Sequence, residues 1–212
     1  MKSDTKKWIE LLAVTITGLL KVVIMDWLQM RAFYIAGVCI FWFIYVIVNY
    51  KNNRKYLKTW GFQKTNFRQS FLFLLPISIV SIILIVVYGL INNTAVLNWN
   101  IILIFLLYPI FGLMQQFMMV GLIAGNLIAI EKIRFKNYQV IILTSIIFSL
   151  IHYTSIFLMI FTFFLEIIFT AVYLKWRNLW SLGLYHGWIG TFLLFYVLER
   201  DLWAELFKWF QI

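Results

Sequence analysis

The feature that most constrains this chain is a succession of long apolar runs separated by short basic segments. A helix rising ~1.5 Å per residue needs ~20 apolar residues to cross a hydrocarbon layer of ~30 Å. Because lipid offers no hydrogen-bond partner to the backbone, such runs must form helices or the strands of a closed barrel. Residues 82–90 lack the alternation that barrel strands require. The sequence therefore predicts an all-α, polytopic transmembrane helix bundle.

Composition supports this class and argues against two others. Hydrophobic residues make up 64% of the chain and charged residues 12%, against ~45–50% and ~25% in soluble domains. The net charge of +10 comes from short clusters between apolar runs, so we expect no nucleic-acid partner. The single cysteine, Cys39, excludes an internal disulfide and a cysteine-based zinc site.

The apolar runs predict about seven spans of membrane-crossing length. Their expected ranges are 8–25, 32–50, 69–91, 101–130, 138–152, 155–174 and 179–198. We divide the chain into two N-terminal helices (1–54), a helical core (55–198) and an amphipathic interfacial tail (199–212).

The basic clusters predict the orientation of the bundle. Segment 51–68 contains Lys51, Arg54, Lys55, Lys58, Lys64 and Arg68 and no acidic residue. The positive-inside rule places this segment, and with it the N-terminus, in the cytoplasm. No small-residue cleavage pattern follows the N-terminal lysines, so the first helix is expected to be retained. We predict a multi-pass protein of a bacterial plasma membrane, in contact with membrane lipid.

A few strongly polar residues lie within the second half of the predicted bundle. They are Gln115, Gln116, His152, Glu166 and His186. Each costs a few kcal/mol at bilayer depth and is therefore a functional candidate. Both histidines of the chain belong to this set, and imidazole is a common metal ligand and proton carrier. The alternative is that each polar group is only an interhelical hydrogen-bond partner, worth ~0.6 kcal/mol.

At these residues the chain resembles the CPBP family of CAAX proteases and bacteriocin-processing membrane proteins. Its motifs are Glu-Glu-x-x-x-Arg, Phe-x-x-x-His and His-x-x-x-Asn on successive helices. Here the second stands intact from Phe148 to His152, and the third keeps His186 but has Gly190 in place of asparagine. In the first motif Gln115 and Gln116 replace both glutamates, and Val120 replaces the arginine. The segment 60–62, Trp-Gly-Phe, also resembles the family, so the resemblance covers about residues 55–195.

The resemblance implies an intramembrane endopeptidase acting on a membrane peptide or protein, with zinc as the cofactor. His152 and His186 would hold the metal or a water molecule, and Gln115 and Gln116 would orient substrate carbonyls. Glutamine has no basic form near neutral pH, and two histidines fall short of the three usual zinc ligands. Glu166 is the acid that could act as the base or the third ligand.

The alternative is a pseudoprotease of the same fold, which binds a membrane peptide or partner without cutting it. The missing glutamates and arginine favour this interpretation, whereas the two retained histidines argue against complete loss of the site. A transporter has little support, because helices broken by Gly and Pro are largely absent.

Overall fold

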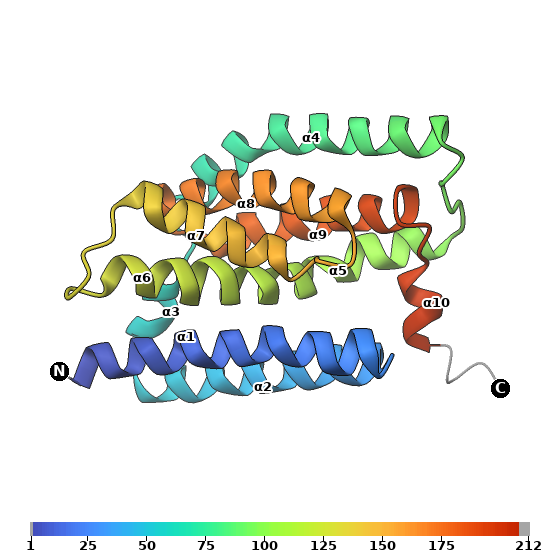
Figure 1. Ribbon diagram of the computed structural model, residues 1–212. Coiled ribbons are helices and arrows are strands. Elements are labelled where there is room, and N and C mark those ends of the chain that lie inside the picture. The colour runs from blue at the N-terminus through green and yellow to red at the C-terminus, as the bar shows by residue number, and fades with distance from the viewer. Residues whose placement is uncertain (1, 208–212) are drawn as a thin grey trace.

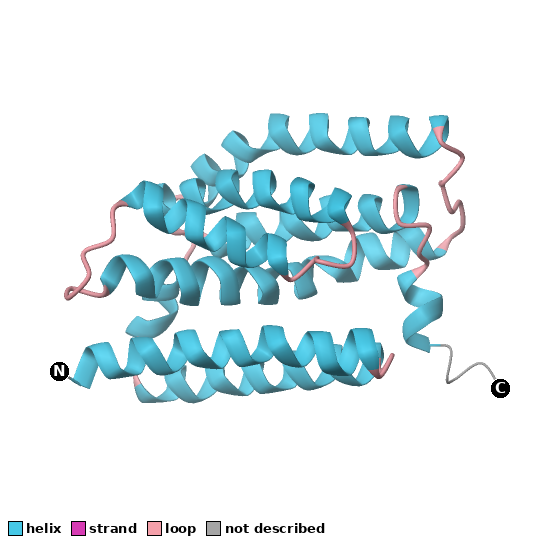
Figure 2. Cartoon of the chain, in the orientation of Figure 1, coloured by secondary structure: helices cyan, strands magenta, loops and turns pink. Residues whose placement is uncertain are grey.

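The computed structural model describes residues 2–207, and every regular element in that range is a helix (Figure 1, Figure 2). The helices are α1 (Lys2–Leu20), α2 (Arg31–Asn52), α3 (Lys55–Trp60), α4 (Phe67–Ile91), α5 (Asn100–Gln116), α6 (Gly125–Ala129), α7 (Asn137–Leu150), α8 (Ile156–Trp176), α9 (Leu179–Tyr196) and α10 (Leu202–Phe207). Two π-helices, η1 (Lys21–Trp27) and η2 (Phe117–Ala124), continue α1 and α5. The predicted all-α class is confirmed.

Several of these helices are long and apolar enough to cross a membrane. Within the described residues there are 5 such stretches, at Asp4–Trp27, Arg31–Asn52, Phe67–Ile91, Asn100–Ala129 and Ile156–Trp176. The chain is a multi-pass membrane protein. The shorter α7 and α9 occupy the positions of the two other predicted spans, so the total of about seven stays a prediction.

The helices form a core with an N-terminal hairpin beside it (Figure 1). The hairpin consists of α1 and α2, and its inner face lies along α5, η2 and α6. Within the core, α9 packs against α5 on one side and α4 on another, while α7 and α8 form an antiparallel pair. α9 has many buried side chains, including Tyr185, His186 and Ile189. The polar positions of α9 are therefore held inside the bundle.

The contact between α5 and α9 depends on glycines at which the two backbones touch. A Cβ atom on Gly112 would lie 2.7 Å from the Gly183 carbonyl oxygen, and one on Gly183 would lie 2.6 Å from Leu113 Cα. A Cβ atom on Gly187 would fall on the backbone of Pro109. Small residues permit this close approach between membrane helices. The approach brings the C-terminal end of α5, with Gln116, beside His186.

The segment 60–62 holds the connection between α8 and α9. Gly61 has a φ of +96°, which ends α3, and its carbonyl accepts a 2.9 Å hydrogen bond from the Leu179 N–H. The Tyr173 hydroxyl donates to the Trp60 carbonyl at 3.1 Å. A side chain at position 61 would lie 2.9 Å from the Arg177 carbonyl oxygen. The family-like Trp-Gly-Phe segment therefore has a structural role in fixing the start of α9.

A buried polar cluster docks the N-terminal hairpin on the core. Glu10 of α1 is 4% exposed and accepts hydrogen bonds from the Tyr45 hydroxyl of α2 and, at 2.7 Å, from the Asn126 amide of α6. Since a buried carboxylate must be paired to be tolerated, these bonds favour one position of the hairpin.

One difference from the expected helix boundaries concerns a predicted site residue. The helix predicted to reach His152 ends at Leu150, and His152 lies in the turn before α8. There the His152 N–H donates to the Ser149 carbonyl at 2.9 Å, and Ser155 caps α8 by accepting from the Leu158 N–H. In the predicted interfacial tail, α10 is helical, and residues 208–212 lie outside the described residues.

Candidate functional site

The predicted site residues of α5, α8 and α9 form one hydrogen-bonded chain. The Gln116 amide nitrogen donates to the Glu166 carboxylate at 3.0 Å and lies 3.1 Å from His186 Nδ1. Gln116 and Glu166 are fully buried, and His186 is 8% exposed. Thr170, one turn along α8, donates to the other Glu166 oxygen at 3.4 Å. The Gln116 amide therefore links the Glu166 carboxyl group to His186.

The two histidines flank the same phenylalanine. The Phe148 ring lies edge-on to His152 and His186, with centroid separations of 5.0 and 5.6 Å. His152 Nδ1 is 3.0 Å from the Phe148 carbonyl oxygen, which makes Nδ1 the protonated nitrogen of that ring. The first and last residues of the Phe-x-x-x-His motif are thus in direct contact, and His152 keeps an unprotonated Nε2.

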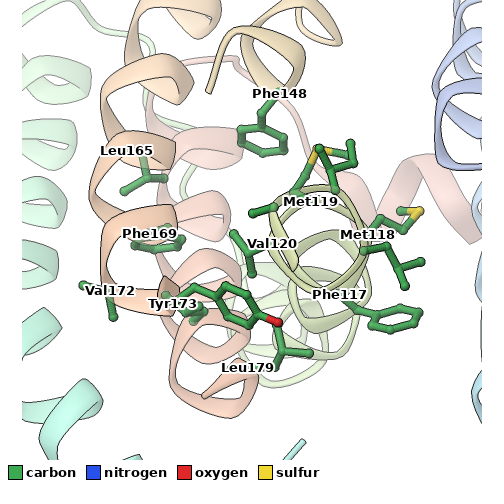
Figure 3. Close-up of a cluster of buried hydrophobic side chains, with 14 of the residues drawn as sticks. Phe117, Met118, Met119, Val120, Phe148, Leu165, Phe169, Val172, Tyr173 and Leu179 are labelled. Carbon is green, nitrogen blue, oxygen red and sulfur yellow. The ribbon is translucent and has the colours of Figure 1, made fainter. Parts of the chain in front are cut away.

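The side chains around this site are mainly apolar. Figure 3 shows Met119 and Val120 of η2 beside Phe148 of α7, with Leu165 and Phe169 of α8 across from them. The π-helix η2 begins directly after Gln116, and π-helical turns often mark functional sites. Polar interactions in such surroundings are little weakened by water.

A cavity of about 210 Å³ lies between the N-terminal hairpin and the core. His152, His186 and Gln115 line it, whereas Gln116 and Glu166 do not. Its volume far exceeds the ~10–15 Å³ that one water molecule requires. The structure therefore brings the predicted residues together in two groups, one facing the cavity and one behind His186.

The side-chain oxygens of both glutamines are buried without a hydrogen-bond partner among the described residues. With the Gln116 amide donating, His186 Nδ1 is the acceptor and its Nε2 carries the proton. The two rings then offer complementary hydrogen-bonding groups: the Nε2–H of His186 is a donor, and the unprotonated Nε2 of His152 is an acceptor. Such a pair matches the C=O and N–H groups of a peptide bond.

The donor set does not fit a catalytic zinc site. Over residues 2–207, no group of three or more His, Cys, Asp and Glu side chains is placed to hold a metal ion. Each histidine has its Nδ1 engaged within the protein, which leaves two Nε2 atoms as candidate ligands. Catalytic zinc generally has three protein ligands, and Glu166 is separated from the cavity by Gln116.

Sequence reasoning missed several charged residues that line the same cavity. They are Lys21 and Asp26 of η1, Arg31 of α2, and Arg200 before α10. Lys21 donates to the Asp26 carboxylate at 2.8 Å and to the Ile151 carbonyl at 3.0 Å. In the sequence these residues lie near the ends of apolar runs and belong to no motif. The available signal was the opposite charge five residues after Lys21, at the end of an apolar run.

Comparison with known proteins bears on this same part of the chain. A family model described as type II CAAX prenyl endopeptidase Rce1-like matches residues 96–192. The predicted CPBP resemblance is confirmed. The matched Rce1-like segment contains all five predicted site residues and the helices α5 to α9 that carry them, apart from the last residues of α9. No curated protein and no solved structure gives a significant match.

Proposed function

We propose that this CAAX-protease-like membrane protein binds a membrane-embedded peptide in its cavity without hydrolysing it. The observation that carries the proposal is the position of Gln116, whose amide lies between the Glu166 carboxylate and His186. Hydrolysis requires a base beside the attacking water. The Glu166 carboxyl group does not line the cavity, and glutamine cannot act as a base, so the acidic base of the family has no counterpart there.

The two other departures from the family motifs support the same proposal. Val120, in the place of the arginine, is fully buried in the apolar cluster. A Cβ atom on Gly190, in the place of the asparagine, would lie 2.6 Å from Cε1 of the Tyr108 ring. Apolar packing therefore occupies both positions, and a polar side chain would require Tyr108 to move.

Peptide binding has groups to support it. His186 Nε2 can donate to a peptide carbonyl, and His152 Nε2 can accept from a peptide N–H. The buried Gln115 carbonyl oxygen, which has no partner among residues 2–207, can accept a further hydrogen bond. The surrounding cavity walls are apolar side chains such as Met119 and Leu165, which suits a hydrophobic peptide or its lipid group.

The test uses a farnesylated CAAX peptide, because the matching family is described by prenyl endopeptidase activity. We expect the purified protein in lipid nanodiscs to bind the labelled peptide and leave it intact by mass spectrometry. His152→Ala and His186→Ala should each weaken binding about 2- to 10-fold, the effect of one lost hydrogen bond. Gln69→Ala, at an exposed position outside the cavity, is the control. Cleavage of the peptide, or equal binding by all variants, would contradict the proposal.

A second candidate is an endopeptidase with a variant site, and the observation favouring it is that both imidazoles line one cavity. In that case His152 Nε2 is the base that faces the cavity, whereas the sequence predicts Glu166 as the base or third ligand. Gln115 and Gln116 would orient substrate carbonyls, as the resemblance implies. Zinc stays a prediction from the same resemblance. Peptide cleavage that is lost in Glu166→Gln, together with stoichiometric zinc lost in both histidine variants, would establish this candidate.

The location and orientation in a membrane are proposals from the sequence. We propose a bacterial plasma membrane, and the basic segment 51–68 places the N-terminus on its cytoplasmic side. A reporter fused to either terminus would test the orientation.

A further inference from the structure

The cavity that contains the histidines also reaches a cluster of charged residues at the end of the bundle where α10 lies (Figure 1). Lys21 and Asp26 neutralise each other there in a 2.8 Å ion pair. Arg31 and Arg200 also line the cavity, and both contact Glu205 of α10, at 2.9 and 2.6 Å. The charged end is thus continuous with the apolar part of the cavity.

This cluster carries more positive than negative charge. Desolvation opposes ionisation of Glu205, but the hydrogen bonds and charges of Arg200 and Arg31 outweigh it and lower its pKa. Glu205 is therefore ionised at neutral pH and compensates one of the two guanidinium groups. The two guanidinium groups share this one carboxylate, so one unit of positive charge stays uncompensated by their ion pairs.

Arg31 has an N–H group that could donate a hydrogen bond to a ligand. Arg31 uses its NH1 atom on Glu205, whereas its Nε atom is buried and has no hydrogen-bond partner among residues 2–207. A buried N–H without an acceptor is unfavourable, and one belonging to a charged group more so. The planar guanidinium matches a carboxylate in particular, because two parallel N–H groups can meet its two oxygens.

We propose that Arg31 and Arg200 bind the terminal carboxylate of the peptide whose apolar part occupies the cavity. This inference rests on the proposed function and adds a direction to it: the C-terminus lies toward α10, and the preceding residues lie toward the histidines. Leu193 and Leu194 of α9 line the cavity together with these two groups of residues. A fatty acid carries the same carboxylate on an apolar chain, so the test must separate the two sources.

The test compares one farnesylated CAAX peptide with a free carboxylate and the same peptide with a C-terminal amide. Binding is measured in nanodiscs of zwitterionic phosphatidylcholine. We expect the free acid to bind about tenfold more tightly, the effect of one charge-assisted hydrogen bond. Palmitate, but not hexadecanol, should compete with the free acid if the site recognises any carboxylate. Competition by neither would identify the peptide terminus as the recognised group.

Variants of the cluster separate binding from folding. Arg31→Gln should remove the preference for the free acid, and Arg31→Lys, which keeps the charge but loses the Nε–H, should retain part of it. Glu205→Gln removes the internal competitor and should strengthen binding of the free acid several-fold, whereas a purely structural ion pair would give weaker binding. Arg68→Gln, at an exposed position in α4 that does not line the cavity, is the control.

The peptide-binding results test the carboxylate site and the proposed function separately. Equal binding of acid and amide would overturn the carboxylate site while leaving the proposed function standing. No binding of either peptide would overturn both. A Glu205→Gln variant that binds the free acid more weakly than the native chain would also count against the carboxylate site.

Discussion

Gly187→Leu is expected to prevent α5 and α9 from packing and to leave little folded protein. Any side chain at this position meets the backbone of Pro109, which no rotamer can avoid. Overpacking of a tight core costs ~1–3 kcal/mol even where neighbours can shift, and a contact with backbone leaves less room to relax. We expect a loss of at least ~3 kcal/mol, measured by unfolding in mixed detergent micelles.

The matched control for this prediction is Gly37→Leu in α2. A Cβ atom on Gly37 has no neighbour within 4 Å, so the same exchange adds a side chain without a clash. It should leave the unfolding midpoint close to that of the native chain. If both variants were equally stable, α5 and α9 would not be in close backbone contact at Gly187.

Gln116→Leu should have the second large effect, because it leaves the buried Glu166 without its amide donor. Only the 3.4 Å contact from Thr170 would remain. Leaving a buried polar group without its hydrogen-bond partner typically costs ~1–3 kcal/mol. Glu166→Gln, which keeps the shape and a hydrogen bond to Gln116, should cost less than ~1 kcal/mol.

A double-mutant cycle isolates the interaction. The Gln116→Leu/Glu166→Leu variant has no unpaired buried carboxyl group, so it should be more stable than Gln116→Leu alone. The single variants of the cycle are Gln116→Leu and Glu166→Leu. If the loss of stability in the double variant equals the sum of their losses, Gln116 and Glu166 do not interact in the membrane. Protein levels and unfolding midpoints for the four proteins are sufficient to distinguish these results.

The site was only partly predictable from sequence. Spacing and chemistry selected Gln115, Gln116, His152, Glu166 and His186, and the family match covers all five. Their positions along the predicted helices placed all five within the bilayer, but such a position carries no information about direction around the helix axis. Hence Glu166 was expected to act as the base or third ligand, whereas it is fully buried and its carboxylate accepts from the Gln116 amide.

Charges near helix ends were the least predictable. Lys21, Arg31 and Arg200 lie near the ends of apolar runs, and their position on a shared cavity depends on how the N-terminal hairpin docks. That docking uses Glu10, Tyr45 and Asn126, which are far apart in the chain. Long-range pairs of this kind leave no periodic signal in the sequence.

By itself, the sequence determined the helical membrane class and the position of its helices, because lipid forces every apolar run of sufficient length to satisfy its own backbone hydrogen bonds. It also determined which polar residues enter the bundle. Tertiary structure alone decided which of them meet: the glycines of α5 and α9 permit a backbone contact that places Gln116 between Glu166 and His186. The physical reason is that helix formation is local, whereas the facing of two helices depends on packing between residues distant in the chain.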